Sequence, residues 1–503
     1  MTTNLFTALQ ARLALDPART AIVWQGRPIT AGALLERAGQ MAAELRASGI
    51  EPGDRVAVQV EKSHENVALF LGALQAGAVY LPLNTGYTLS ELDYFIGDAE
   101  PRVMVADPRN ATELTPLVEQ RGGRLVTLDA EGQGTLSLAA DRRKPAAAAS
   151  SAGPDDIAAI LYTSGTTGRS KGAMLTHGNL WSNTQALIQS WGFTGDDVLI
   201  HALPLFHTHG LFVALDVCLA TGAEIILLPR FDADQVIDLM RDATVLMGVP
   251  TFYTRLLANP RLDRTTTANM RLFISGSAPL LAETHERFTA RTGHAILERY
   301  GMTETGMNTS NPLDGERRPG SVGLPLPGVE VRVVDKDGTP VCPNEIGGIE
   351  VKGPNVFTGY WRLPEKTKSE FRDDGFFITG DLGTMSEDGY LSIVGRDKDL
   401  IISGGFNVYP KEIEDALNDQ DGIAESAVIG VPHPDFGEAV VAVIVPREPT
   451  DPPDEKAVIA ATRDALAAYK RPKRVMITDA LPRNTMGKVQ KSELRKLHRG
   501  LFG

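Results

Sequence analysis

The feature that most limits the fold of this chain is a regular alternation of apolar strand-like runs and helical segments over its first two thirds. RVAVQV (55–60), AVYLPL (78–83) and RVMVAD (102–107) have the β-branched, apolar composition of buried strands. ENVALFLGALQAG (65–77) lies between the first two, with helical spacing and a terminal glycine. A second cycle runs from DVLIHALP (197–204) to TVLMGVP (244–250). Strands that alternate with helices form mainly parallel sheets covered by helices, so we predict an α/β fold.

The remaining third has a different pattern of predicted secondary structure. From about residue 320 the chain is β-rich. After GRDKD (395–399) helix-like and strand-like runs follow one another again, and KAVIAATRDALAAYK (456–470) is predicted to be an amphipathic helix. A chain of 503 residues exceeds one compact domain. We predict a large N-terminal domain, 1–395, built from parallel α/β sheets plus a β-rich subdomain, and a small α+β C-terminal domain, 396–503. KPAAAASSAGPDD (144–156) is predicted to be a flexible connector.

Charge and cysteine content exclude several classes of protein. A net charge of -13 disfavours nucleic acid as a partner, because phosphate backbones are repelled. The two cysteines, Cys218 in an apolar helical stretch and Cys342 after a turn, have no metal-ligand spacing, which favours a reducing cytoplasm. The N-terminal stretch lacks the pattern of a secretory signal, and no run approaches the roughly 20 apolar residues that span a bilayer. We therefore expect a cytoplasmic protein without a membrane partner.

The strongest local signal is the loop YTSGTTGRSKG (162–172). Its three glycines allow tight backbone turns that present N–H groups, its hydroxyl side chains add donors, and Lys171 adds a positive charge. Such a loop suits the β- and γ-phosphates of a nucleotide. Its spacing differs from the G-x-x-x-x-G-K-[ST] of the P-loop nucleoside triphosphatases, so that class is excluded.

TSGTTGRSKG resembles the phosphate loop of the adenylate-forming superfamily, which contains acyl- and aryl-CoA synthetases, peptide-synthetase adenylation domains and beetle luciferases. Five further motifs resemble that family in the same order: GSAP (276–279), YGMTE (300–304), TGD (379–381), the hinge segment IVGRDKDLIISGGFNVYPKEIE (393–414) and PRNTMGKVQK (482–491). The resemblance covers nearly the whole chain. It implies ATP and Mg²⁺ as cofactors, coenzyme A as the thiol substrate, and a C-terminal domain that moves between two half-reactions.

The resemblance also implies roles for individual residues. The implied ATP-binding residues are Thr163, Ser164, Gly165, Thr166, Thr167, Gly168, Lys171, Gly276, Ser277, Ala278, Glu298, Arg299, Tyr300, Gly301, Met302, Thr303, Asp381, Arg396 and Lys488. The implied catalytic residues are Lys488, His207, Thr303 and Glu304. Glu304 and Thr163 are implied to bind Mg²⁺, for which hard oxygen ligands are suited. Asp397 is the implied hinge. Gly404 and Gly405 are implied to form the passage for pantetheine. This set would neutralise the two anions, carboxylate and α-phosphate, that the reaction brings together.

Arg299 departs from the family pattern in an informative way. Many members carry a small residue immediately before the motif tyrosine, and a guanidinium there would be poorly solvated unless it met an anion. Arginine suits bidentate recognition of a carboxylate. The alternative is a structural ion pair with Glu298 or Glu286, and Arg255 is a second candidate for an acid's distal carboxylate.

The other predicted acid-binding residues suggest a narrow pocket. They are His207 and Thr208 of PLFHTHG (204–210), together with Ser277, Met302 and Met307, whereas His209 is expected to be structural. We therefore predict a short acid with a second carboxylate. ERYGMTETGMN and PLFHTHG resemble malonyl-CoA synthetases, some of which also accept methylmalonate.

The resemblance implies the reaction of malonate, ATP and coenzyme A to malonyl-CoA, AMP and pyrophosphate. The alternatives are a ligase for oxalate, acetate or a benzoate, and an amino-acid adenylating enzyme, for which PLFHTHG offers no acidic residue to meet an α-amine. A nucleotide-binding relic is disfavoured by intact Lys488, Glu304 and Asp381. Related ligases are switched off by acylation of the catalytic lysine, so an acetyltransferase and a deacetylase acting on Lys488 are expected partners. We expect a monomer or a weak homodimer.

Overall fold

The computed structural model describes residues 4–163, 170–463, 465–484 and 487–502. The chain divides into two compact units, Met1–Val331 with Val351–Phe377, and Arg332–Glu350 with Ile378–Gly503. The mixed α/β class predicted from the sequence is confirmed. The predicted boundary at 395/396 falls within the second unit, and the assignment of an adenylation domain and a mobile domain stays a prediction.

The first unit contains a seven-stranded sheet in the order β18-β8-β7-β4-β3-β5-β6. Its strands β3 to β7 pair in parallel, whereas β8 and β18 run antiparallel to their neighbours. The bounds are β3 Arg55–Gln59, β4 Val79–Pro82, β5 Val103–Ala106, β6 Arg124–Thr127, β7 Ile157–Thr163, β8 Lys171–Thr176 and β18 Gly359–Tyr360. The strand runs predicted at 55–60, 78–83 and 102–107 are confirmed.

A nine-stranded sheet in the order β15-β14-β13-β12-β11-β9-β10-β1-β2 also belongs to the first unit. Its six central strands are parallel, and the strands at both edges are antiparallel. The bounds are β1 Thr20–Trp24, β2 Arg27–Thr30, β9 Val198–His201, β10 Glu224–Leu227, β11 Val245–Gly248, β12 Leu272–Ser275, β13 Leu297–Met302, β14 Gly306–Ser310 and β15 Leu324–Pro325. Central parallel strands are buried on both faces, which explains their continuous apolar sequences.

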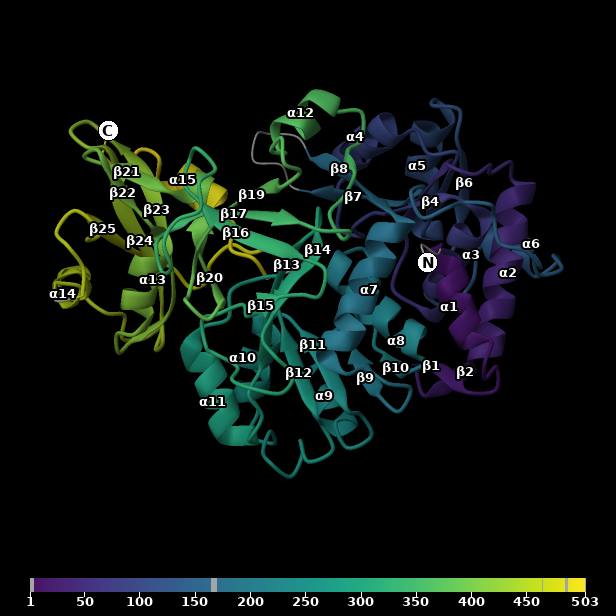
Figure 1. Cartoon of the computed structure of the whole chain (residues 1–503), viewed down its shortest axis with the longest axis horizontal. Helices are drawn as coiled ribbons and strands as arrows, with labels where there is room; N and C mark the ends of the chain where they lie inside the picture. Colours follow the sequence, from purple (N-terminus) through teal and green to yellow (C-terminus); the bar gives the residue numbers. More distant parts are fainter. Residues whose placement is uncertain (1–3, 164–169, 464, 485–486, 503) are drawn as a thin grey trace. The chain divides into compact units, whose positions relative to one another are not determined.

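Helices connect these strands, and α1, α2 and α3 pack against one another (Figure 1). Ser63 caps the start of α3 through its side chain, and Gly77 ends it with φ +85°. The helices of this unit are α1 Leu5–Leu13, α2 Ala31–Ala47, α3 His64–Ala76, α4 Leu89–Ala99, η1 Pro108–Asn110, α5 Ala111–Glu119, α6 Thr135–Ala140, α7 His177–Trp191, η2 His209–Leu215, α8 Asp216–Thr221, α9 Ala233–Leu239, α10 Pro250–Ala258, α11 Ala282–Thr292 and α12 Pro364–Ser369.

Two segments differ from the sequence-based expectation. The connector 144–156, predicted to be flexible, is bonded to the helices beside it, since the Ala146 and Ser150 amides donate to the carbonyls of Gly39 and Gln75. The apolar stretch around Cys218 begins as a π-helix, η2, and becomes α-helical only in α8, where Cys218 is buried. The widened turn of a π-helix often marks a functional segment, and η2 follows directly on Thr208.

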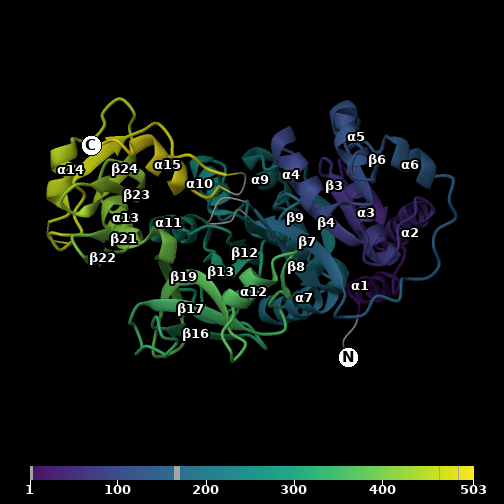
Figure 2. The same ribbon diagram turned by 90° about the horizontal axis from the view of Figure 1, so that it is seen from above.

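The second unit holds a five-stranded sheet in the order β22-β21-β24-β23, with β25 beside β24, and α13 packs on β23 (Figure 2). Most of a four-stranded sheet, β16-β17-β19-β20, also belongs to it. The bounds are β16 Glu330–Val334, β17 Gly347–Lys352, β19 Phe377–Met385, β20 Leu391–Arg396, η3 Asp397–Asp399, β21 Ile401–Ser403, β22 Phe406–Val408, α13 Pro410–Asn418, β23 Ile423–His433, β24 Gly437–Pro446, α14 Glu455–Ala461, β25 Arg474–Ile477 and α15 Lys491–His498.

The helix predicted over 456–470 is much shorter than expected. It ends at Ala461, where the Thr462 hydroxyl donates to the Ile459 carbonyl, 2.7 Å away. A threonine that bonds back to the preceding turn competes with helix continuation. The chain then bends so that Leu466 enters the core of this unit. None of the helices in the described ranges is long and apolar enough to cross a membrane.

Candidate active site

The two ends of the predicted phosphate loop lie side by side. Strands β7 and β8 are antiparallel with Thr163 opposite Lys171, so the loop is the connection of a hairpin. The Thr163 hydroxyl lies 3.5 Å from the Lys171 carbonyl oxygen. Ser164, Gly165, Thr166, Thr167 and Gly168, all predicted to bind ATP, lie outside the described residues. The hairpin brings a hydroxyl and an ammonium group to the same edge of the seven-stranded sheet.

Lys171 belongs to a charged cluster with Tyr360 and Glu370. Its Nζ lies 3.1 Å from Glu370 Oε1 and 3.9 Å from the centre of the Tyr360 ring. The Tyr360 hydroxyl lies 2.7 Å from Glu370 Oε2 and 3.0 Å from Glu304 Oε1. Burial, followed by the nearby Glu304 and Glu370 charges, raises the pKa of Tyr360, so the hydroxyl keeps its proton and acts as the donor. The predicted phosphate lysine and the predicted Mg²⁺ ligand therefore contact one tyrosine.

Glu304 lies in the tight turn between β13 and β14. Met302 pairs with Gly306 across this hairpin, which places Thr303 and Glu304 at its tip, and Tyr300 and Gly301 in β13. A Cβ on Gly301 would lie 2.0 Å from the Gly306 carbonyl oxygen, so the close pairing of these strands requires glycine there. The Glu304 residue is buried, with 6% of its surface exposed. The tight turn therefore fixes the backbone that carries the buried Glu304 carboxylate.

The donors present fit a magnesium ion held partly by substrate. The described residues contain no group of three or more His, Cys, Asp or Glu side chains that could hold a metal. Mg²⁺ in nucleotide sites is usually bound by one or two carboxylates or hydroxyls together with phosphate oxygens. Glu304 and Thr163 match that donor set.

The predicted adenine segment follows strand β12. Gly276, Ser277 and Ala278 begin immediately after Ser275, and Ser277 has φ +71°, a left-handed conformation that is unusual for serine. A Cβ on Gly276 would lie 2.4 Å from Cζ of Arg299. The guanidinium therefore rests directly against the backbone of this segment. Glu298, the residue before it, accepts a hydrogen bond from the Leu280 amide at 3.0 Å.

Arg299 is buried without an ion pair in the part of the chain that the structure describes. Only 3% of its surface is exposed, and its Nε and Nη2 atoms have no hydrogen-bond partner there. Burial lowers the pKa of Arg299 to about 9. The structural alternative, an ion pair with Glu298 or Glu286, is not formed. A buried guanidinium with unmet donors is costly, and an anion in contact with it would remove that cost.

His209 extends the polar cluster around Arg299. Its Nδ1 lies 3.2 Å from the Ser277 hydroxyl oxygen, and its buried Nε2 has no partner among the described residues. Burial, then the Arg299 charge, holds the pKa of His209 well below its usual range, so this ring is neutral. The buried Ser275 hydroxyl also lacks a partner within the described ranges. Arg299 and His209 thus both have unused hydrogen-bonding capacity.

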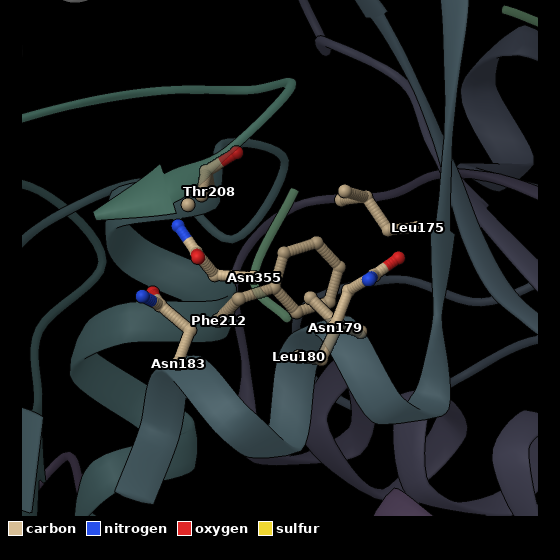
Figure 3. Close-up of a pocket in the computed structure, with 8 residues that line it drawn as sticks. Leu175, Asn179, Leu180, Asn183, Thr208, Phe212 and Asn355 are labelled. Carbon is tan, nitrogen blue, oxygen red and sulfur yellow. The ribbon is translucent and has the colours of Figure 1, made fainter. Parts of the chain in front are cut away.

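His207 and Thr208 lead into η2. Burial lowers the pKa of His207 to about 4, so this ring is neutral at physiological pH. The Thr208 side chain is buried and its hydroxyl has no partner among the described residues. It lines a small cavity (Figure 3) with Leu175, Asn179, Leu180, Asn183, Phe212, Gly306 and Asn355. The cavity shares Thr208 with the predicted acid-binding residues, and Arg299 does not line it.

The remaining predicted acid-binding residues differ in exposure. Met307 is buried, and its amide and carbonyl are both bonded to the Asn183 side chain. Met302 is half-buried at the end of β13. Arg255 is exposed on α10. An exposed arginine is already solvated and gains less from an anion than the buried Arg299 does.

The second unit contains the predicted ribose-binding residues Asp381 and Arg396 and the predicted catalytic Lys488. Asp381 in β19 lies opposite Arg396 in β20, and Arg396 Nε is 2.8 Å from Asp381 Oδ1. The Lys488 amide donates to Asn484 Oδ1 at 2.9 Å, across a turn. Desolvation of the ammonium, then repulsion by Arg396, lowers the pKa of Lys488 to about 8, which places the lysine in the field of the Asp381–Arg396 pair.

Gly404 and Gly405 form the two-residue turn between β21 and β22. Their φ values are +59° and +82°, which fit a turn of mirror-image type that favours glycine. A Cβ on Gly405 would meet no atom within 4 Å. Backbone geometry therefore favours glycine at both positions, and the role of this turn as the passage for pantetheine stays a prediction. Asp397, the predicted hinge, is exposed at the start of η3.

Two protein-family models match this chain. The AMP-binding enzyme family matches residues 9–361, and the AMP-binding enzyme C-terminal domain matches residues 412–488. A feruloyl-CoA synthase of Amycolatopsis is 38% identical over 96% of this chain and 97% of its own length. A malonate–CoA ligase of Arabidopsis thaliana is 36% identical over 91% of this chain and 80% of its own length.

A solved structure is more similar still. An ATP-bound MatB of Rhodopseudomonas palustris is 58% identical, with a TM-score of 0.98 and full coverage of both chains. The chain therefore belongs to the AMP-binding enzyme family, among its AMP-forming acid–CoA ligases. The resemblance stated from the motifs is confirmed.

Sequence reasoning missed three residues of this region. Tyr360 and Glu370 lie in the segment FTGYWRLPEKTKSEF, which carries no motif that was recognised, and only the fold brings them to Lys171 and Glu304. His209 was expected to be structural, but its unpartnered Nε2 lies in the Arg299 cluster. The HTHG sequence was the available signal for His209.

Proposed function

We propose that this ligase activates malonate, with methylmalonate as a second substrate, and transfers the acyl group to coenzyme A. The observation that carries the proposal is Arg299, a buried guanidinium with two unmet donors beside Gly276. A distal carboxylate would satisfy both donors in a bidentate contact. The neutral His209, whose Nε2 also has no partner among the described residues, lies close enough for the Arg299 charge to lower its pKa. A monocarboxylate would leave the two Arg299 donors without a partner.

In the first half-reaction, an oxygen of the reacting carboxylate attacks the α-phosphorus of ATP. The new O–P bond forms as the bond to the β-phosphate oxygen breaks, so the acyl-adenylate and pyrophosphate result. We assign to Lys171 the contact with the outgoing phosphates, and to the Lys488 ammonium the contact with the reacting carboxylate and α-phosphate, as the family resemblance implies. His207 is neutral, with a pKa lowered to about 4, and can donate one N–H bond without adding charge. Mg²⁺, when bound by Glu304 and Thr163, supplies charge neutralisation at the phosphates.

In the second half-reaction, the coenzyme A sulfur attacks the acyl carbon and AMP leaves. The C–S bond forms as the acyl C–O bond to AMP breaks, and the thiol proton passes to solvent. We assign the ribose of AMP to the Asp381–Arg396 pair in both steps. We assign the turn at Gly404 and Gly405 to this second step and the pivot to Asp397. These assignments rest on the family resemblance and on the positions of these residues in the second unit.

A panel of acids tests the proposal. Pyrophosphate release and acyl-CoA formation are measured with malonate, methylmalonate, oxalate, acetate, butyrate, benzoate, ferulate and glycine. We expect malonate to have the highest kcat/KM, followed by methylmalonate. Ferulate belongs in the panel because a similar relative is a feruloyl-CoA synthase. A higher kcat/KM for ferulate, benzoate or butyrate than for malonate would overturn the proposal.

A further inference from the structure

Tyr360 holds a central position between two groups that the proposed function assigns to the polyphosphate. It belongs to β18, which pairs with β8 in antiparallel register, with Tyr360 opposite Ala173. The Trp361 amide donates to the Gly172 carbonyl at 2.7 Å. Since Lys171 begins β8, this pairing fixes the tyrosine ring beside the lysine stem.

The same short segment is also tied to the turn that carries Glu304. The Phe357 amide donates to the Glu304 carbonyl at 2.8 Å. The side chains then meet, with the Tyr360 hydroxyl 3.0 Å from Glu304 Oε1. Residues 357–361 therefore connect the phosphate-loop strand to the β13–β14 turn through both backbone and side-chain bonds.

Glu370 completes the arrangement from the end of α12. Its Oε2 lies 2.7 Å from the Tyr360 hydroxyl, and its Oε1 lies 3.1 Å from Lys171 Nζ and 2.8 Å from Lys366 Nζ. One hydroxyl proton thus faces two carboxylates. The hydroxyl can donate to only one of the two carboxylates at a time. If a cation binds Glu304, the hydroxyl can still donate to Glu370 and keeps a hydrogen-bond partner.

We propose that Tyr360 is a positioning residue that aims the Glu304 carboxylate and the Lys171 ammonium at one Mg²⁺–polyphosphate group. The hydroxyl orients Glu304 before the metal arrives, and the ring face and Glu370 orient Lys171. When Glu304 turns to the metal, the hydroxyl donates to Glu370 alone. This inference rests on the proposed roles of Glu304 and Lys171. It adds a residue that contacts the predicted metal ligand rather than the metal itself.

Equilibrium binding of an unreactive nucleotide tests this role directly. The probe is α,β-methylene-ATP, measured by titration calorimetry in Mg²⁺ and again in EDTA. Tyr360→Phe removes only the hydroxyl and keeps the ring beside Lys171. Because partners behind a metal ligand typically contribute 10–100-fold to metal affinity or activity, we expect Mg²⁺ to tighten the analogue roughly 10- to 100-fold less in the variant than in the wild type.

Two controls separate this effect from general damage. AMP lacks the β- and γ-phosphates, so its Kd should change by less than about twofold in Tyr360→Phe, a change of under roughly 0.5 kcal/mol. Tyr80→Phe removes another buried tyrosine hydroxyl, which donates to Asn66 Oδ1 at 2.8 Å, and should leave the Mg²⁺ effect unchanged. An unchanged Mg²⁺ effect in Tyr360→Phe, or an equal loss for AMP, would overturn the inference.

A wild-type protein that binds the analogue without any Mg²⁺ effect would also contradict the role of the Tyr360 hydroxyl. If the enzyme activated an acid other than malonate, the proposed substrate would be wrong, but this inference about Tyr360 would be unaffected.

Discussion

Replacing Arg299 by methionine tests the assignment of the distal carboxylate. Methionine is long, apolar and adaptable, so it can fill the space beside Gly276 without adding a polar group. In the variant, the second carboxylate of malonate would enter the pocket without its partner. Removing one member of a buried charge pair costs about 2–5 kcal/mol. That corresponds to a loss of roughly 30-fold to several-thousand-fold in kcat/KM for malonate.

The same substitution should act on the unliganded protein in the opposite direction. Burial lowers the pKa of Arg299 to about 9, far below its usual range, which reflects a destabilising charge on the order of a few kcal/mol. At pH 7 the arginine is protonated in both the folded and the unfolded state, so the whole cost is present there. Arg299→Met should therefore melt at the same temperature as the wild type or higher. Saturating malonate should raise the melting temperature of the wild type only.

The diagnostic quantity is the ratio of kcat/KM for malonate to kcat/KM for butyrate. Butyrate has no distal charge, so it should lose little in Arg299→Met and can gain. The exposed Arg255 provides the comparison, because Arg255→Met should leave the ratio within about twofold, under roughly 0.5 kcal/mol. Equal losses for both acids in Arg299→Met would refute the reasoning. A collapse of the ratio in Arg255→Met would move the carboxylate contact to that residue.

Three further predictions concern Lys488. Lys488→Ala should lose adenylate formation by several orders of magnitude, measured as ATP–pyrophosphate exchange, yet still convert supplied malonyl-adenylate and coenzyme A to product; normal exchange would contradict the assignment. Stoichiometric acetylation of Lys488, confirmed by mass spectrometry, should inactivate the enzyme and a deacylase should restore it, because acetylation removes the charge; retained activity would count against this. Since the pKa of Lys488 is lowered to about 8, the ammonium is lost as pH rises through that value, and adenylation should fall above pH 8. The activity of Lys488→Arg should not fall above pH 8. The same fall in both proteins would assign this pH dependence to another group.

Much of the fold follows from local sequence patterns. The continuous apolar runs that end at Gln59, Pro82 and Ala106 predicted parallel strands because a strand buried on both faces has no polar alternation. The short α14 was not predictable in the same way. Its sequence continues with helical periodicity, and the helix ends because Thr462 bonds back to the preceding turn and Leu466 packs into the core.

The residues of the candidate site also fall into two groups, those that local sequence patterns predict and those that only the fold brings together. Motifs in a characteristic order predicted Lys171, Glu304, Asp381 and Lys488 as site residues, because each lies in a short segment with a recognisable pattern. Tyr360 and its partners depend on strand pairing between distant segments, β8 and β18, which no local pattern encodes. The unusual residue before the motif tyrosine marked Arg299 as important. Only the structure shows that its donors lack partners among the described residues.

The most direct test of the account is a crystal structure of the protein with malonate, Mg²⁺ and α,β-methylene-ATP. The account predicts that one carboxylate lies near the α-phosphate and that the other accepts hydrogen bonds from Arg299 Nε and Nη2, two atoms without partners in the described residues. Both should lie within normal hydrogen-bond distance, about 2.7–3.2 Å. A distal carboxylate bound by another cation, or left in solvent with Arg299 still unpaired, would contradict the central claim.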